Sequence, residues 1–462
     1  MTDKFWDTVE EYKQLGFDPL RWIPICSNEI DSYVLQSSLR EIKRSAFKIE
    51  PSWFDAFYFT DGRSPELTRR VYNFNEPKVE REVEIKRALS TFRIHTEIGE
   101  DPVLLSDAIK KFLKAFHSKI TIKKISTNLT VHPEGQCAIL DYIDLHRGTK
   151  AGYITASNST TQITDATQRP DSEIHSNIAL TAAMENLNLL GCTSGFRVFP
   201  AYDAPTDGLL DTIRKNLDIF TSRYNIAMED YSSLKVGKLF FGATAVANTM
   251  KELPTRYDQV EQGMQIIVSD KFGAVPALSL YLLTEMDPNN IEKIEQNHIL
   301  PTVLSSAKDE VIKTLTEPNF SFGKIISRYC PDFGTMFDKY AHVTAVYPIT
   351  TDGIFAIEKL AELTNSHIII NEVPIKYEEI AKYVTREFLI ENATASSNGC
   401  HLIVAPNDLA GSVTRDLRKH GFEPAIIGFV ARKERPYVVF EKDISKYVAS
   451  SAKLNRLNHT HE

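Results

Sequence analysis

The stretch NGCHLIVAPNDLAGSVTRDLRKHGFEPAIIGFV, residues 398–430, decides the fold. An Asn-Gly turn opens it and an apolar strand follows. A helix comes next, with Gly421 at its end, where glycine is common because it adopts the left-handed conformation without strain. The stretch closes with a second apolar strand, Ile-Ile-Gly-Phe-Val. This succession of strand, helix and strand indicates an α/β or α+β protein.

Strands and helices continue to alternate on the N-terminal side of this stretch. Residues 349–375, ITTDGIFAIEKLAELTNSHIIINEVPI, predict a turn, a helix and a strand, and residues 177–191, NIALTAAMENLNLLG, predict an apolar helix. The other predicted strands are KITIKKIS (119–126), CAILDYIDL (137–145), AGYITAS (151–157), KLFFGATAVA (238–247) and QIIVSD (265–270). Further helices are predicted at DPVLLSDAIKKFLKAF (101–116) and GLLDTIRKNLDIFTSRY (208–224).

The length of 462 residues predicts two or three domains at about 150 residues each. The first stretch mixes aromatic and charged residues and ends in the charge-dense segment NEPKVEREVEIKR. We therefore predict four parts: an N-terminal extension that folds as a cap (1–85), an N-terminal domain (86–264), a C-terminal domain (265–445) and a polar tail (446–462).

The composition limits the classes of function. Lys and Arg total 53 and Asp and Glu total 61, which gives a formal net charge of −8 and argues against a nucleic-acid partner. No apolar run is long enough to span a membrane, so no membrane partner is expected. The acidic, aromatic start lacks a signal-peptide core, and the five cysteines are scattered. We expect a cytoplasmic protein without a disulfide framework or a thiolate zinc site.

Three of the passages, in the same order and spacing, resemble the aminoimidazole ribonucleotide (AIR) synthetase superfamily, which has the PurM-like fold. Its members include thiamine-monophosphate kinase, selenophosphate synthetase and a hydrogenase maturation protein. Residues 398–430 are similar to the unit with which its members end. Residues 349–375 resemble their Asp-x-Ser-Asp-Gly turn, helix and strand, and residues 177–191 resemble a helix that carries Ser-Asp and ends in glycine. The resemblance covers roughly residues 90–440.

The resemblance implies a two-domain α/β fold and a ligand. In this superfamily an N-terminal domain pairs across a homodimer to form a barrel, and a C-terminal α/β domain covers it. ATP binds in the cleft, and several aspartates hold magnesium for phosphoryl transfer or for activation of an oxygen. Hard oxygen ligands suit this chemistry because they hold the cations that neutralise a triphosphate.

The positions that the resemblance assigns to the ligand cleft carry few acids in this chain. The third residue of the Thr-Thr-Asp strand end corresponds to Asn158, and the acid of the Ser-Asp helix corresponds to Asn186. A Gly-Gly-Asp segment aligns loosely with a stretch that ends at Asp230, and the Asp-Gly turn is kept as Asp352 and Gly353. These five residues are the candidate nucleotide- or phosphate-binding residues, and Asp230 and Asp352 are also the candidate metal ligands. The catalytic residues stay unassigned.

The early Gly-Asp-Asp-Ala-Ala strand of the superfamily corresponds to Gly-Gln-Cys-Ala-Ile at residues 135–139, which lacks both acids. An amide offers magnesium a neutral oxygen in place of an anionic one, so the usual magnesium and ATP chemistry should be weakened. Asp352 before Gly353 also fits an ordinary turn. The hydroxyl-rich run SNSTTQITDATQ, residues 157–168, is predicted to be an exposed loop, with a ligand-binding role as the alternative.

The sequence is compatible with three functions. The first is a divergent relative of AIR synthetase that keeps a nucleotide- or phosphate-ligand cleft while its catalysis is lost or altered, a possible pseudoenzyme. The second is an active ATP-dependent phosphotransferase or synthetase acting on a small molecule, in which Asp141, Asp165 or Glu185 would hold the magnesium. The third is a non-catalytic interaction scaffold whose extension fills the cleft. A homodimer is expected in each case.

Overall fold

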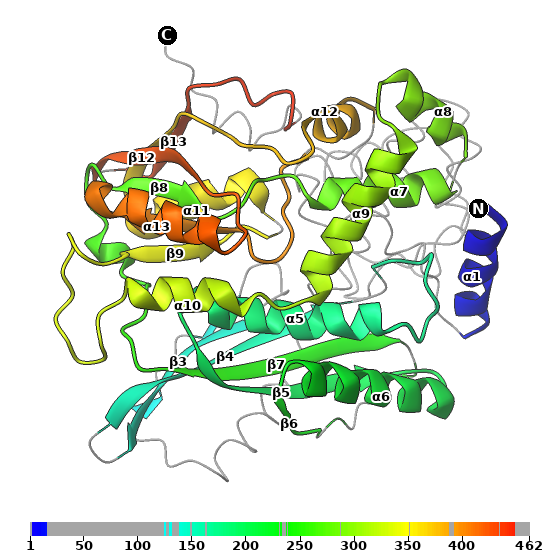
Figure 1. Ribbon diagram of the computed structural model, residues 1–462, viewed down its shortest axis with the longest axis horizontal. Helices are drawn as coiled ribbons and strands as arrows, with labels where there is room; N and C mark the ends of the chain where they lie inside the picture. Colours follow the sequence, from blue (N-terminus) through cyan, green and yellow to red (C-terminus); the bar gives the residue numbers. More distant parts are fainter. Residues whose placement is uncertain are drawn as a thin grey trace, which may run out of the picture.

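The structure is a computed structural model. It describes residues 2–15, 124–125, 129–131, 138–147, 150–161, 164–230, 232, 237, 239–286, 288–350, 352–387, 392–433 and 435–448. Within these residues the chain forms ten α-helices and two mixed sheets, which makes it a mixed α/β protein (Figure 1). The helix predicted at residues 101–116 and most of the N-terminal extension lie outside the described residues.

The first sheet has seven strands in the order β1-β3-β4-β7-β5-β6, with β2 also paired to β3. Their bounds are β1 Lys124–Ile125, β2 Leu129–Val131, β3 Ala138–Arg147, β4 Lys150–Thr161, β5 Ser194–Asp203, β6 Ala227–Met228 and β7 Phe240–Thr249. All pairings are antiparallel except that of β5 with β6. The strands predicted at 137–145, 151–157 and 238–247 are therefore confirmed.

One expectation about this sheet is wrong. Residues 157–168 are predicted to be an exposed loop, but β4 continues to Thr161, and residues 164–168, which do form bends and turns, are buried or half-buried. Ser157 and Ser159 are buried, and each lies opposite an alanine of β7 in the register. Alternate residues of a strand face the same side, so small hydroxyl residues fit a closely packed sheet face. Periodicity failed here because serine and threonine do not register as apolar.

Helices α5 (Glu173–Leu189) and α6 (Asp207–Arg223) pack against this sheet. Ser172 and Thr206 begin them as N-caps, each accepting a hydrogen bond from a backbone N–H of the first turn. Helix α5 is buried on nearly all sides, since it lies between the first sheet and the helices and strands of the second half (Figure 1). A helix that is enclosed on every side needs no polar face, which explains the apolar sequence at 177–191.

The second sheet has six strands in the order β13-β10-β12-β8-β11-β9. Their bounds are β8 Gln265–Val268, β9 Ala345–Pro348, β10 Ser366–Ile370, β11 His401–Ala405, β12 Ala425–Lys433 and β13 Tyr437–Phe440. Only β10 and β13 run parallel. The succession of β11, α13 (Asn407–Lys419) and β12 confirms the strand, helix and strand predicted for residues 398–430.

The remaining helices surround the second sheet or connect it to the first. They are α1 Thr2–Gln14, α7 Val275–Met286, α8 Asn289–Gln296, α9 Pro301–Thr316, α10 Phe320–Arg328, α11 Ala356–Thr364 and α12 Glu378–Glu387, with short 3-10 helices η5 at Tyr257–Gln259 and η6 at Gly353–Phe355. Helices α9 and α10 contact α5, and α10 also contacts α13. Helix α1 lies beside α7 and buries Phe5, Val9 and Tyr12.

A single hydrophobic core crosses from one half to the other. Leu187 of α5, Phe322 of α10 and Ile403 of β11 all belong to it. A second core, around Ile266 and Leu402, fills the opposite face of the second sheet. The first core therefore joins the two sheets into one body.

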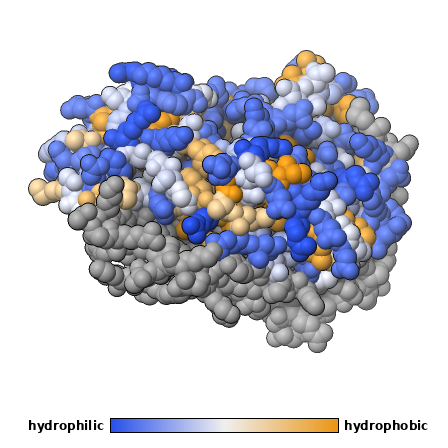
Figure 2. Space-filling view, turned by 60° about the horizontal axis from the view of Figure 1, so that its bottom comes forward, coloured by the Kyte–Doolittle hydropathy of each residue, from blue (hydrophilic) through white to orange (hydrophobic). Residues whose placement is uncertain are grey.

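The face shown in Figure 2 is mainly hydrophilic, with hydrophobic residues in small groups. The largest exposed apolar side chains of the described residues include Met336 and Tyr340, in the loop after α10. No helix among the described residues has the length and apolar character needed to cross a bilayer.

Candidate functional site

One of the candidate residues, Asn186, lies at the contact between α5 and β4. The Asn186 side chain is 8% exposed, and its Nδ2 donates a hydrogen bond of 2.9 Å to Oγ of the buried Ser157. Asn158 follows Ser157 in β4 and pairs with Thr244 of β7, and its side chain lies outside the described part of the molecule. Of the five candidate residues, this contact therefore involves Asn186 directly, and Asn158 only as the chain neighbour of Ser157.

Asp230 lies just after β6, the strand at one edge of the same sheet. Its Oδ2 accepts a hydrogen bond of 2.6 Å from the Tyr202 hydroxyl and lies 3.6 Å from Nε of Arg214, and its Oδ1 accepts one from the N–H of Ser232. Arg214 also donates to the Tyr202 hydroxyl. The Asp230 carboxylate thus belongs to a network that holds the segment after β6 against β5.

Asp352 and Gly353 lie in the second half, at the start of η6. The Asp352 carboxylate is buried and forms an ion pair of 2.7 Å with Nζ of Lys359. Gly353 has φ +54°, and a Cβ added there would lie 2.5 Å from Oγ1 of Thr394 and 2.6 Å from its backbone oxygen. Only glycine fits this position without displacing the 392–394 segment, so the Asp-Gly pair has a structural role of its own.

No group of three or more His, Cys, Asp or Glu residues suited to a metal ion occurs among the described residues. Both predicted metal ligands have a cationic neighbour, Arg214 for Asp230 and Lys359 for Asp352. Asp165, one of the acids considered as replacements, accepts hydrogen bonds from the N–H and hydroxyl of Thr167. These acids therefore have local partners.

Glu185, another of those acids, is buried at the boundary between the two halves. Its Oε1 accepts a hydrogen bond of 3.2 Å from the N–H of Asn319, and its Oε2 lies 4.0 Å from Nε2 of His401 in β11. Burial raises the pKa of the Glu185 carboxyl to about 7 and lowers the pKa of His401 to about 3. His401 is therefore neutral at physiological pH, and the pair is not a permanent ion pair. The ring of Phe322 stacks on His401 with centroids 4.2 Å apart.

A second buried polar group lies under α1. The Tyr12 hydroxyl contacts Nε2 of His175 at 3.1 Å and donates to the carbonyl oxygen of Gln168 at 3.0 Å. Burial raises the pKa of Tyr12 and lowers that of His175 to about 4, so both side chains are neutral near pH 7. This contact attaches the N-terminal helix to the beginning of α5.

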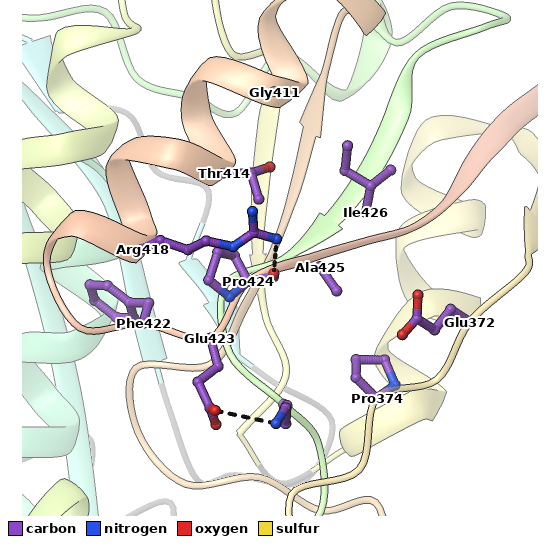
Figure 3. A pocket seen from close by; sticks show the side chains of 11 residues that line it. Glu372, Pro374, Gly411, Thr414, Arg418, Phe422, Glu423, Pro424, Ala425 and Ile426 are labelled. Carbon is purple, nitrogen blue, oxygen red and sulfur yellow. Dashed lines mark hydrogen bonds and ion pairs between the residues drawn. The ribbon is translucent and has the colours of Figure 1, made fainter.

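The second sheet carries an open groove with a volume of about 660 Å³ (Figure 3). It lies where β8 and β10 end and β12 begins, next to α13, and Lys271, Glu372 and Arg418 are among the residues that line it. The sequence does not indicate this groove, because its walls come from three separate stretches of the chain, near residues 271, 372–374 and 411–426. A glycine inside α13, Gly411, was the one local signal, since glycine disfavours a helix interior.

The sequence also does not indicate the partners of Glu185 and Asp352, which are His401 and Lys359. The pairing of Glu185 with His401 joins a helix to a strand of the other half, and the sequence gives no sign of such a contact. Lys359 is seven residues from Asp352, about two helical turns away. It could have been found only by placing the Asp-Gly turn directly before a helix.

The sequence matches no protein-family model, and it matches no curated protein. Solved structures do resemble the fold. Thiamine-monophosphate kinase from Stenotrophomonas maltophilia is 15% identical with a TM-score of 0.46, over 65% of this chain and 89% of that one. The kinase from Aquifex aeolicus is 15% identical with a TM-score of 0.45, over 73% and 96%.

A hydrogenase maturation protein from E. coli is 15% identical with a TM-score of 0.41, over 63% of this chain and 83% of that one. Another structure of such a protein is a complex with ATP. In its structure the chain is similar, at low sequence identity, to thiamine-monophosphate kinases and hydrogenase maturation proteins with the PurM-like fold.

Proposed function

We propose that this protein binds a nucleotide or another phosphate-bearing small molecule at the contact of α5 and β4, without the multi-metal chemistry of an ATP-dependent kinase. The proposal rests on the three sequence passages and on the convergence of Ser157 and Asn186 at one place. It includes the two-domain organisation, the barrel-forming N-terminal domain and the homodimer that the resemblance implies.

The observation that carries the proposal is the pairing of both candidate metal ligands with cations. Asp352 contacts Lys359 at 2.7 Å, and Asp230 lies 3.6 Å from Arg214. Mg²⁺ prefers anionic oxygens that it does not have to share with a lysine or an arginine. To bind magnesium, each carboxylate would first have to give up its cation. Amides at positions 158 and 186 add no negative charge, and a neutral amide repels a phosphate less than a carboxylate does.

The test is isothermal titration calorimetry of the full chain with ATP, AMP and inorganic phosphate, each with and without Mg²⁺. We expect binding whose affinity is unchanged by the metal. Micromolar ATP binding that requires Mg²⁺ would contradict the proposal and favour an active phosphotransferase.

A charge variant tests the position of the site. Asn186→Asp places a carboxylate at the α5–β4 contact and should weaken metal-free binding of ATP by about tenfold, because two like charges then lie close together at low exposure. Gln296→Glu adds the same charge on exposed α8 and should leave the affinity unchanged. Equal effects of the two substitutions would place the ligand elsewhere.

The packing of α1 favours a second function, that of a non-catalytic interaction scaffold. The segment after β4 leads to Gln168, whose carbonyl oxygen accepts the Tyr12 hydrogen bond, so the start of the chain packs close to the end of that strand. In this case neither ATP nor phosphate at millimolar concentration would raise the melting temperature. A ligand that binds only the folded state must raise it, by an amount set by RT ln(1 + [L]/Kd).

A further inference from the structure

The groove on the second sheet is built from four segments that meet at one sheet edge. Lys271 follows β8, Glu372 and Pro374 follow β10, residues 422–426 lead into β12, and α13 forms the remaining wall. In Figure 3, Arg418 and Glu372 lie on opposite sides, with Ala425 and Ile426 between them. The groove is separate from the α5–β4 contact, which involves the first sheet.

Two cations and two carboxylates line the groove. Nη2 of Arg418 donates a hydrogen bond of 3.3 Å to the carbonyl oxygen of Pro424, which holds the guanidinium in place and uses one of its five N–H groups. The Glu372 side chain is exposed and has no hydrogen bond or ion pair with any other described residue. Lys271 and Glu423 neutralise each other in an ion pair of 3.2 Å.

The space between the charges is apolar and open. Ile426 is 41% exposed, an unusual state for a branched apolar residue in a strand between two neighbours. Pro374 and Pro424 give the two walls rigid backbone. Gly411 on α13 leaves further room, since an added Cβ would meet no atom within 4 Å. The helix keeps this glycine although alanine would be about 1 kcal/mol more favourable there.

We propose that this groove binds a small zwitterionic molecule, of the chemistry of a short peptide with both termini free. Its carboxylate contacts the guanidinium of Arg418, its ammonium group contacts the Glu372 carboxylate, and an aliphatic side chain covers Ile426. The two cations and two carboxylates of the lining cancel, which disfavours a polyanion such as a nucleotide and suits a ligand that carries one charge of each sign.

The probe is the tripeptide Ala-Leu-Ala, which spans at most about 10 Å when extended. It is compared with its N-acetylated and its C-amidated forms by calorimetry on the full chain. We expect the free peptide to bind about threefold to fivefold more tightly than either blocked form, the effect of one solvent-exposed ion pair. A lack of binding by all three peptides at millimolar concentration would overturn the proposal.

Matched variants assign each end of the peptide. Glu372→Gln should abolish only the preference for the free peptide over its N-acetylated form. Arg418→Gln should abolish only the preference for the free peptide over its C-amidated form. The control is Arg415→Gln, an exposed arginine of the same helix outside the groove, which should change neither. If both groove variants affected both preferences equally, or neither, the two contacts would be wrong.

Gly411→Leu tests the groove without removing a charge. Leucine favours a helix over glycine, so the variant should fold at least as stably as the natural chain, and its side chain should fill the groove. We expect peptide binding to be lost while the melting temperature is kept. Unchanged binding in this folded variant would show that the peptide binds elsewhere, and competition of the peptide by inorganic phosphate would show that the groove is a general anion site.

Discussion

Glu185 illustrates how burial gives one carboxyl group a measurable effect on the whole protein. Its folded-state pKa of about 7 exceeds the ordinary value of 4.5, so the folded protein holds a proton that the unfolded chain releases. The stability is therefore highest below pH 4.5 as far as this group is concerned. The contribution of Glu185 to stability falls as the pH rises from 4.5 to about 7, and it stays constant above pH 7. His401 has the opposite sign, because its pKa is lowered to about 3 and stability falls as the pH drops from 6.5.

Glu185→Gln should remove the first of these effects. The amide has no proton to lose, so the unfolding free energy of the variant relative to the natural chain should rise by up to about 1.4 kcal/mol per pH unit between pH 5 and 7. Urea unfolding at several pH values measures it. Glu295→Gln on the surface of α8 is the control, and parallel curves for Glu185→Gln and the natural chain would contradict the assignment of a raised pKa.

Tyr12 makes a similar contribution through hydrogen bonds. Tyr12→Phe keeps the ring that packs in the core but leaves Nε2 of His175 without its hydroxyl partner. We expect a loss of about 1–3 kcal/mol in the free energy of unfolding, the usual cost of a buried polar atom without a partner. Tyr340→Phe removes a hydroxyl from a side chain that is 72% exposed and should change stability little. Similar losses in both variants would show that the Tyr12 hydroxyl is not held as described.

At the scale of the elements, the packing of α10 on α5 depends on one small residue. A Cβ at Gly323 would lie 2.6 Å from the carbonyl oxygen of Cys192 and 3.2 Å from Cα of Asn188. Both neighbours are backbone atoms, which cannot rotate away as a side chain can. Asn319, just before α10, donates to Glu185, and Phe322 of α10 stacks on His401, so a displacement of α10 would disturb both members of the buried pair.

Two glycines in helices should therefore respond oppositely to the same change. Gly323→Ala should destabilise the protein by about 1–3 kcal/mol through overpacking, although alanine favours a helix. Gly411→Ala, in the open wall of α13, should stabilise it by about 0.5–1 kcal/mol. Thermal unfolding of both variants gives the comparison, and a stabilising Gly323→Ala would mean that α5 and α10 are farther apart than described.

The elements that the sequence predicted are those that local patterns determine. Helix α5 and the succession β11, α13 and β12 follow from apolar periodicity and turn residues, which involve neighbours along the chain. The partners of the candidate site could not be predicted in this way. Asn186 contacts Ser157, and Glu185 contacts His401, only because α5 packs between the two sheets. No spacing in the sequence specifies that arrangement.

At the scale of the whole molecule, the homodimer stays a prediction. It follows from the sequence resemblance, and it has a physical reason, since strands at the edge of a sheet keep unpaired N–H and C=O groups that a second copy could satisfy. Light scattering should give a mass near twice 52.3 kDa at tens of micromolar protein. A strict monomer at that concentration would rule out the barrel formed between two copies.

The core that crosses from the first sheet to the second has a consequence for how such a gene can change. Leu187, Phe322 and Ile403 come from both sides of the connection between β7 and β8, so a cut there would leave apolar surface on each fragment. Neither fragment would be a transferable module. If recombination exchanged one half for that of a distant relative, the core residues at the boundary between the two sheets would have to change together to pack again. Point substitutions on the outer surfaces carry no such requirement.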